Sequence, residues 1–254
     1  MPAAPSPLSE NTGLAFIGET EWPPAVVSAK RAGTLALARN PAGRPNSDIL
    51  RSFIGRSGRR LREHWQIDFP AHYHEQESAL HEKPFAILAG KVAARTEDWW
   101  INPHAQPLLR QALARLDRFL AIAIDAPEPA WMWYETNHLP DASLLVVARD
   151  EDFAHAMVQS AAFVSWWHTH FRKESPTMVI ESFPFPWPLA TPLGSLSKEQ
   201  QEVRSSAARA ALAGDAEQLN AAVAAAYGWN RSLDEAGTLD RLRHLHAQRG
   251  GFPA

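Results

Sequence analysis

The stretch that most constrains the fold is NPAGRPNSDILRSFIGRSGRRLREHWQIDFP, residues 40–70. Its first part, 40–48, contains Asn-Pro, Gly and Pro residues, which mark consecutive turns because each restricts or frees the backbone at a fixed position. The apolar residues over 49–54 recur at helical spacing, so we expect a short helix there. Apolar and polar residues then alternate over 65–69, which predicts a half-buried strand.

Outward from this stretch, short apolar runs alternate with amphipathic segments. We expect strands at 14–17, 120–124, 131–134 and 143–148, the last because SLLVVA is a continuous apolar run between turn residues. We expect helices, each with one apolar face, over 75–92, 106–120, 150–171, 198–213, 215–227 and 233–248. Gly214 is expected to end the helix over 198–213, and Gly228 the helix over 215–227. The pattern predicts an α+β fold, a mixed twisted sheet with flanking helices, followed by a small C-terminal helical tail.

Composition shifts divide the chain into four ranges. Residues 1–13 are rich in Pro, Ala and Ser and are expected to form a disordered leader. Residues 14–180 carry the mixed α+β pattern of one domain. Residues 181–196 contain four prolines among aromatic residues, so we expect an extended belt laid across a hydrophobic surface. Residues 197–249 are expected to form a separate helical subdomain.

The overall composition excludes several classes of protein. The 254 residues include no cysteine, which excludes disulfides, thiolate nucleophiles and cysteine-ligated metal sites. No apolar run approaches the roughly 20 residues that span a bilayer, and the N-terminus lacks the pattern of a signal peptide. We therefore expect a soluble, cytoplasmic protein without a membrane partner.

Basic residues are concentrated in one part of the chain. The net charge of −3 argues against indiscriminate binding to nucleic acid. Between residues 30 and 62, however, only Asp48 opposes a run of basic residues: Lys30, Arg31, Arg39, Arg44, Arg51, Arg56, Arg59, Arg60 and Arg62. The planar fork of arginine suits bidentate contacts to phosphate and to guanine. A solvated surface loop would have the same composition, so charge alone leaves both interpretations open.

Motifs of known chemistry are scarce. The sequence has no Gly-rich phosphate loop, no G-x-S-x-G elbow and no H-E-x-x-H pair. His72 and His74, beside Glu75 and Glu77, form the best metal candidate, but no third ligand stands at a recognisable spacing, and a polar turn at the start of a helix explains them better. Tryptophans occur in tight clusters at 99–100, 131–133 and 166–167, as large core residues or as platforms on which bases stack.

Several segments, in order, resemble one family. Residues 40–70 and ESALHEKPFAILAGKV, residues 77–92, resemble the target-recognition region of large adenine-N6 DNA methyltransferases, including the type IIL restriction–modification enzymes and related phage-defence methylases. Further landmarks are LPDASLLVVARDEDF (139–153), PTMVIESFPFPWP (176–188) and AAYGW (225–229). The resemblance implies a target-recognition fold over nearly all of 14–249. It also implies that the chain is a specificity subunit or domain.

The resemblance further implies what this chain lacks and what it binds. In that family a separate catalytic domain binds S-adenosylmethionine and carries an Asn-Pro-Pro-Tyr/Phe motif, whereas Asn40-Pro41 continues here as Ala-Gly. We therefore expect no enzyme activity and no cofactor in this chain alone, with double-stranded DNA and a methyltransferase catalytic subunit as partners. The residues expected to anchor phosphates are Arg44, Arg51, Arg56, Arg59, Arg60 and Arg62. Those expected to approach base edges are Trp131, Trp133, Glu135, Asn137 and His138.

One departure from the family leaves a second hypothesis open. Family members carry basic residues where this chain reads IDAPEP, residues 124–129, with two acids and no base. Carboxylates repel phosphates, although they can accept a hydrogen bond from cytosine N4. The alternative is a remnant or interaction protein that does not bind DNA and docks onto a methyltransferase or another defence component. A stand-alone hydrolase or metalloenzyme has no supporting nucleophile–base spacing, and we assign no catalytic or metal-ligating residue.

Overall fold

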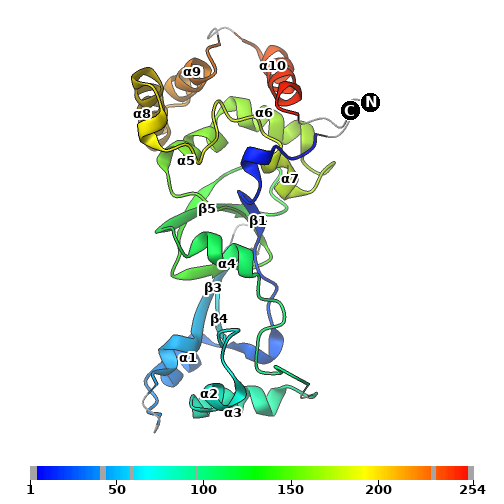
Figure 1. Cartoon of the computed structure of the whole chain (residues 1–254), viewed down its shortest axis with the longest axis vertical. Helices are drawn as coiled ribbons and strands as arrows, with labels where there is room; N and C mark the ends of the chain where they lie inside the picture. The colour runs from blue at the N-terminus through cyan, green and yellow to red at the C-terminus, as the bar shows by residue number, and fades with distance from the viewer. Residues whose placement is uncertain (1–4, 41–43, 58–59, 95, 230–232, 251–254) are drawn as a thin grey trace. The chain divides into compact units, whose positions relative to one another are not determined.

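The computed structural model describes residues 5–40, 44–57, 60–94, 96–229 and 233–250. The chain forms two compact units, each assembled from separate stretches of sequence (Figure 1). The unit that we call the helical unit comprises Met1–Phe16, Ala112–Glu135 and Leu145–Ala254. The unit that we call the hairpin unit comprises Ile17–Gln111 and Thr136–Leu144. The expectation that 14–180 and 197–249 fold independently stays a prediction.

The helical unit contains a four-stranded sheet in the order β1-β8-β5-β6. The strands are β1 (Ala15–Ile17), β5 (Arg118–Ala123), β6 (Met132–Glu135) and β8 (Leu144–Val147). All of β8 is buried, as expected from its unbroken apolar run. Because β5 already begins at Arg118, the helix expected over 106–120 is shorter, and α4 spans Pro107–Leu113.

In its described residues, the helical unit also contains the α-helices α5 (Asp152–Gln159), α6 (Ala161–His170), α7 (Pro176–Glu181), α8 (Lys198–Ala213), α9 (Ala216–Ala226) and α10 (Glu235–Gln248) (Figure 1). The single helix expected over 150–171 is divided at Ser160, whose hydroxyl accepts the N–H of Phe163 and caps α6. The last three helices are confirmed, with Gly214 in the left-handed conformation at φ 69° after α8. They share one core with α5 and α6.

In the range expected to form a belt, the aromatic residues are buried, and a 3₁₀ turn forms at Leu193–Ser195. Phe183, Phe185 and Trp187 are at most 7% exposed, and the Trp187 ring stacks on Phe153 at 5.2 Å. Part of the expected leader also packs on this surface. Leu8 is buried, and the Asn11 amide donates to the carbonyl oxygen of Phe183 at 2.8 Å. Residues 1–4 of that leader lie outside the described residues.

The hairpin unit contains a mixed sheet in the order β2-β4-β3-β7. Its strands are β2 (Val26–Val27), β3 (Leu50–Ser57), β4 (Arg60–Ile67) and β7 (His138–Pro140). β3 and β4 pair as an antiparallel hairpin, and β7 runs parallel to β3. The α+β class is therefore confirmed, with two four-stranded sheets in place of one.

The helix expected over 49–54 is wrong, because this segment forms most of β3. Only a 3₁₀ turn at Asn46–Ile49 is helical there. A short apolar run fits a buried strand as well as a helix, and here neighbouring strands on both sides supply the hydrogen-bond partners. The strand expected around residue 65 is confirmed as β4.

The turns before β3 are held by Asn46, which is fully buried. Its amide donates to the carbonyl oxygen of Leu35 at 2.9 Å and accepts from Asn40 at 2.7 Å. This unit contains the helices α1 (Ala29–Ala36), α2 (Glu75–Ala79) and α3 (Glu82–Lys91) and the first part of α4, so the helix expected over 75–92 is divided in two. These turns set the start of β3 and thereby the register of the arginines that follow.

Candidate nucleic-acid interface

The outer half of the β3–β4 hairpin is a two-stranded ribbon. β7 pairs with β3 only at 52–54, and β2 pairs with β4 only at 65–66. No other described strand flanks Gly55–Ser57 or Arg60–Arg62. Residues that face each other in an antiparallel pair point to the same side, so the pairing assigns two faces. The arginine face carries Arg51, Gly55, Arg60, Arg62 and His64, and the glutamate face carries Ser52, Arg56, Leu61 and Glu63.

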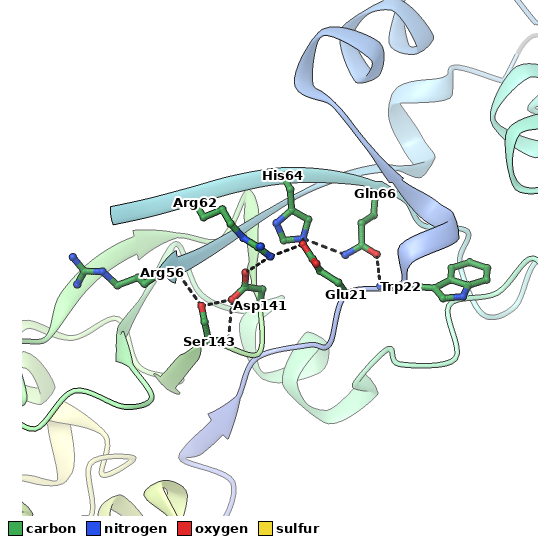
Figure 2. A network of polar contacts seen from close by, with 8 residues as sticks. All are labelled: Glu21, Trp22, Arg56, Arg62, His64, Gln66, Asp141 and Ser143. Atoms are coloured by element: carbon green, nitrogen blue, oxygen red, sulfur yellow. Dashed lines mark hydrogen bonds and ion pairs between the residues drawn. The ribbon is translucent and has the colours of Figure 1, made fainter. Parts of the chain in front are cut away.

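A polar network lies over the part of the arginine face around Gly55 and Arg62 (Figure 2). The Arg62 guanidinium forms ion pairs with Glu21 and, at 3.5 Å, with Asp141. Asp141 in turn accepts the N–H of Ser143 at 2.9 Å, and the Ser143 hydroxyl accepts the N–H of Arg56 at 2.7 Å. Two carboxylates therefore balance the charge of Arg62, although its side chain is 48% exposed.

Gly55 makes this network possible. A Cβ at Gly55 would lie 1.9 Å from the Asp141 carboxylate, so only glycine leaves room for the acid over the sheet. His64 lies beside Glu21, with 3.2 Å between Nε2 and the carboxylate. Burial lowers the pKa of His64, against the attraction of Glu21. The imidazole therefore favours its neutral form, and Arg62 is the cation of the cluster.

The six arginines expected to anchor phosphates are not equivalent. Arg44 lies over the Tyr73 ring, donates to its hydroxyl at 3.0 Å and approaches Glu77 at 3.7 Å, so it holds the turn before β3. Arg56 is half-buried. Arg51 and Arg60 are exposed and form no ion pair with a described residue. Arg59 lies outside the described residues.

The residues expected to read bases are divided between the two units. Trp131 belongs to the core of the helical unit: it is 3% exposed and its ring contacts Phe163 and Trp167. Burial therefore leaves its ring no surface for a base in this structure. Trp133 is half-buried beneath the Arg118 guanidinium, 3.9 Å from the ring centre. Glu135 is exposed at the end of β6.

In the hairpin unit, Asn137 is exposed and His138 is the first residue of β7. The Ser52 hydroxyl donates to Glu63 at 3.1 Å and lies 2.8 Å from Nδ1 of His138. A hydrolytic relay needs the serine proton to go to the histidine, with the acid on the far side of the ring. Here the serine lies between the acid and the histidine, so the cluster positions side chains and does not generate a nucleophile.

A buried ion cluster, which the sequence analysis missed, lies elsewhere in the hairpin unit. The Arg110 guanidinium forms bidentate hydrogen bonds with the carboxylates of Glu19 and Asp68, at 2.6–3.1 Å. Burial opposes the charge on Arg110, but the bonds and attraction of both acids outweigh it and raise its pKa. Burial raises the pKa of Asp68, and the charge of Glu19 adds to the rise, whereas Arg110 lowers it. The signal in the sequence was an aspartate between Ile67 and Phe69, which needs a partner when buried.

The polar-turn interpretation of the His72–His74 pair is confirmed, because the His74 N–H donates to Glu77 at the start of α2, at 3.2 Å. Among the described residues, no group of three or more His, Asp or Glu side chains could hold a metal ion. Within the same part of the chain, no helix is both long and apolar enough to cross a bilayer.

Comparison with known proteins gives a likeness to a solved structure. No family model matches the chain, and no curated protein matches it. Among solved structures, the fold is similar to that of the Type IIL restriction-modification enzyme MmeI in complex with DNA, with a TM-score of 0.56. The likeness covers 98% of this chain and 36% of that chain, at 11% sequence identity. This chain thus has the fold of about a third of a restriction–modification enzyme.

Proposed function

We propose that this chain is a sequence-specific DNA-recognition module that positions a separate S-adenosylmethionine-dependent catalytic domain of an adenine-N6 methyltransferase, in restriction–modification or phage defence. The observation that carries the proposal is the two-stranded ribbon with exposed arginines on one face. The family resemblance and the fold of MmeI support it. In the proposed complex the catalytic partner supplies the cofactor and the chemistry, and this chain alone transfers no methyl group.

The ribbon suits duplex DNA in shape and in charge. A two-stranded β-ribbon fits the major groove, whereas a wider sheet does not. Arg51 and Arg60 are exposed and form no ion pair with a described acid, although the charge of Arg51 helps to lower the pKa of Asp68, so both can neutralise phosphates without first breaking an ion pair. Arg62 must first leave Glu21 and Asp141, so we expect a smaller contribution from it.

The test is binding of a fluorescent duplex pool between about 50 and 200 mM salt. Each phosphate contact contributes about −0.9 to the slope of log affinity against log salt. Arg51→Ala and Arg60→Ala should each flatten that slope by about one contact, and Glu21→Gln should steepen it by releasing Arg62. Arg209→Ala, an exposed arginine of α8, is the matched control and should leave the slope unchanged. Absence of duplex binding at the lowest salt would refute the proposal.

The second candidate is an interaction protein that docks a methyltransferase or another defence component without binding DNA. The exposed acids Asp125 and Glu128 and the neutralised Arg62 favour it. Co-purification with a catalytic subunit, together with no shift of any duplex, would support this candidate over the first. Both outcomes can be read from one preparation of the two proteins.

A further inference from the structure

Glu63 is the only acidic residue among the arginines of β3 and β4, between Leu50 and Ile67. Its side chain is exposed, and it forms no ion pair with any residue in the described part of the chain. A carboxylate on this ribbon repels phosphates and lowers affinity for any duplex. It lies on the glutamate face, opposite Ile54, whereas Arg60 and Arg62 point to the other side.

The Glu63 carboxylate is held in place from below. The Ser52 hydroxyl, 4% exposed on the neighbouring strand, donates to Oε1 of Glu63 at 3.1 Å. Ser52 is held in turn by His138, its direct partner in the β3–β7 pair, with Nδ1 2.8 Å from the hydroxyl oxygen. Three strands therefore fix one carboxylate oxygen, and the second oxygen accepts no hydrogen bond from a described residue.

The position of each proton in this chain of hydrogen bonds follows from counting the donors. The single hydroxyl proton of Ser52 goes to Glu63, so Nδ1 of His138 must carry a proton and donate to Ser52. The second oxygen of Glu63 stays available as an acceptor on the glutamate face, so this position selects a ligand that offers a donor.

In the major groove only cytosine N4 and adenine N6 offer donors, because guanine and thymine present acceptors at the corresponding positions. Adenine also presents N7, an acceptor, beside N6, and this nitrogen repels the second oxygen of a carboxylate. Cytosine has no such neighbour. On the basis of the proposed DNA-recognition function, we propose that Glu63 is a specificity-determining residue that reads cytosine, with Ser52 and His138 as its positioning residues.

The experiment is selection of bound duplexes from a randomised pool by the full chain, with wild type, Glu63→Gln and Ser52→Ala in parallel. Wild type should enrich a motif with cytosine at one position, at about 5- to 150-fold over the other bases. Glu63→Gln should remove the preference for cytosine at that position or replace it with a preference for adenine, because glutamine binds adenine through N6 and N7. The rest of the motif should stay unchanged. Ser52→Ala should weaken the cytosine preference at the same position, and Ser52→Thr should restore it.

Glu82→Gln, an exposed glutamate of α3 in the same unit, is the matched control and should select the wild-type motif. Selection of that same motif by Glu63→Gln would overturn the assignment of Glu63 while the DNA-recognition function stands. A wild type that binds duplexes without preference would also overturn it. A wild type that binds no duplex would overturn the proposed function and the role of Glu63 together.

Discussion

Replacing Arg110 with alanine should cost more stability than any other single arginine substitution considered for this chain. Its guanidinium donates to both oxygens of Glu19, at 2.6 and 2.7 Å, and to both oxygens of Asp68, at 2.7 and 3.1 Å. The Glu19 side chain is 0% exposed and that of Asp68 is 4% exposed, so water cannot replace the lost donors. Arg110→Ala leaves two buried carboxylates with no cation between them.

The magnitude follows from the cost of an unpaired buried charge. Removing one partner of a buried ion pair costs about 3–5 kcal/mol, and the presence of two acids favours the upper end. A domain is stable by only about 5–15 kcal/mol, so the loss is a large fraction of the total. With a urea dependence of about 2 kcal/mol/M, the midpoint of unfolding should fall by about 2 M.

The loss should depend on pH. Burial raises the pKa of Asp68 in the folded state, so its contribution to stability is full below its ordinary value of 3.8 and is lost as pH rises through the raised pKa. Without Arg110, which lowers that pKa, the rise is larger. Arg110→Ala should therefore destabilise the protein more at pH 7 than at pH 5.

The assay is urea unfolding, followed by tryptophan fluorescence and far-UV circular dichroism. Arg110→Lys keeps the charge but loses the planar guanidinium, so its loss of stability should lie between those of wild type and Arg110→Ala. The control Arg115→Ala, at an exposed residue, should change stability by less than about 0.5 kcal/mol. Arg110→Met combined with Glu19→Gln and Asp68→Asn should recover part of the loss. An Arg110→Ala variant that unfolds within about 1 kcal/mol of wild type at pH 7, with the same urea dependence, would show that Glu19 and Asp68 do not need this cation.

Three further predictions concern single positions. Gly55→Ala should destabilise the hairpin unit by about 1–3 kcal/mol in urea unfolding, because a Cβ there meets Asp141 at 1.9 Å; an unchanged midpoint would contradict the close approach. Burial lowers the pKa of His170 to about 4, so its contribution to stability is full above 6.5 and is lost as pH falls through about 4. His170→Gln should flatten the fall in thermal midpoint between pH 6.5 and 4, whereas exposed His104→Gln should not. Gly214→Ala should lower the free energy of unfolding by about 1–2 kcal/mol, measured by thermal unfolding, because φ is 69° at this position. An unchanged stability would show that α8 does not end in a left-handed residue.

Local patterns predicted the elements whose conformation is decided within a few residues. The three C-terminal helices were predicted to within about two residues, because each has a capping residue and an apolar face of its own, and glycines follow the first two. β8 was predicted for the same kind of reason, as an unbroken apolar run between turns. The fold class follows from the order of such elements.

The sequence analysis failed at residues whose conformation or burial depends on partners that are distant in sequence. The run over 49–54 has a helical spacing of apolar residues, yet it becomes β3 because β4 and β7 take its backbone hydrogen bonds. Trp131 alternates with Trp133 as a surface strand would, yet it is buried because α6 packs over it through Phe163 and Trp167. No window of a few residues contains either fact.

Composition and short-range periodicity were enough to predict the class of fold and the arginine-rich segment, and ordered motifs carry the family resemblance. The availability of each arginine depends on tertiary contacts. Arg62 is balanced by Glu21 and Asp141, which are 41 and 79 residues away, whereas Arg60 is not. Tertiary contacts also bring together Ser52 and His138, which are 86 residues apart, beneath Glu63. The physical reason is that the charge and hydrogen bonding of a side chain depend on its neighbours in space, and strand pairing sets those neighbours.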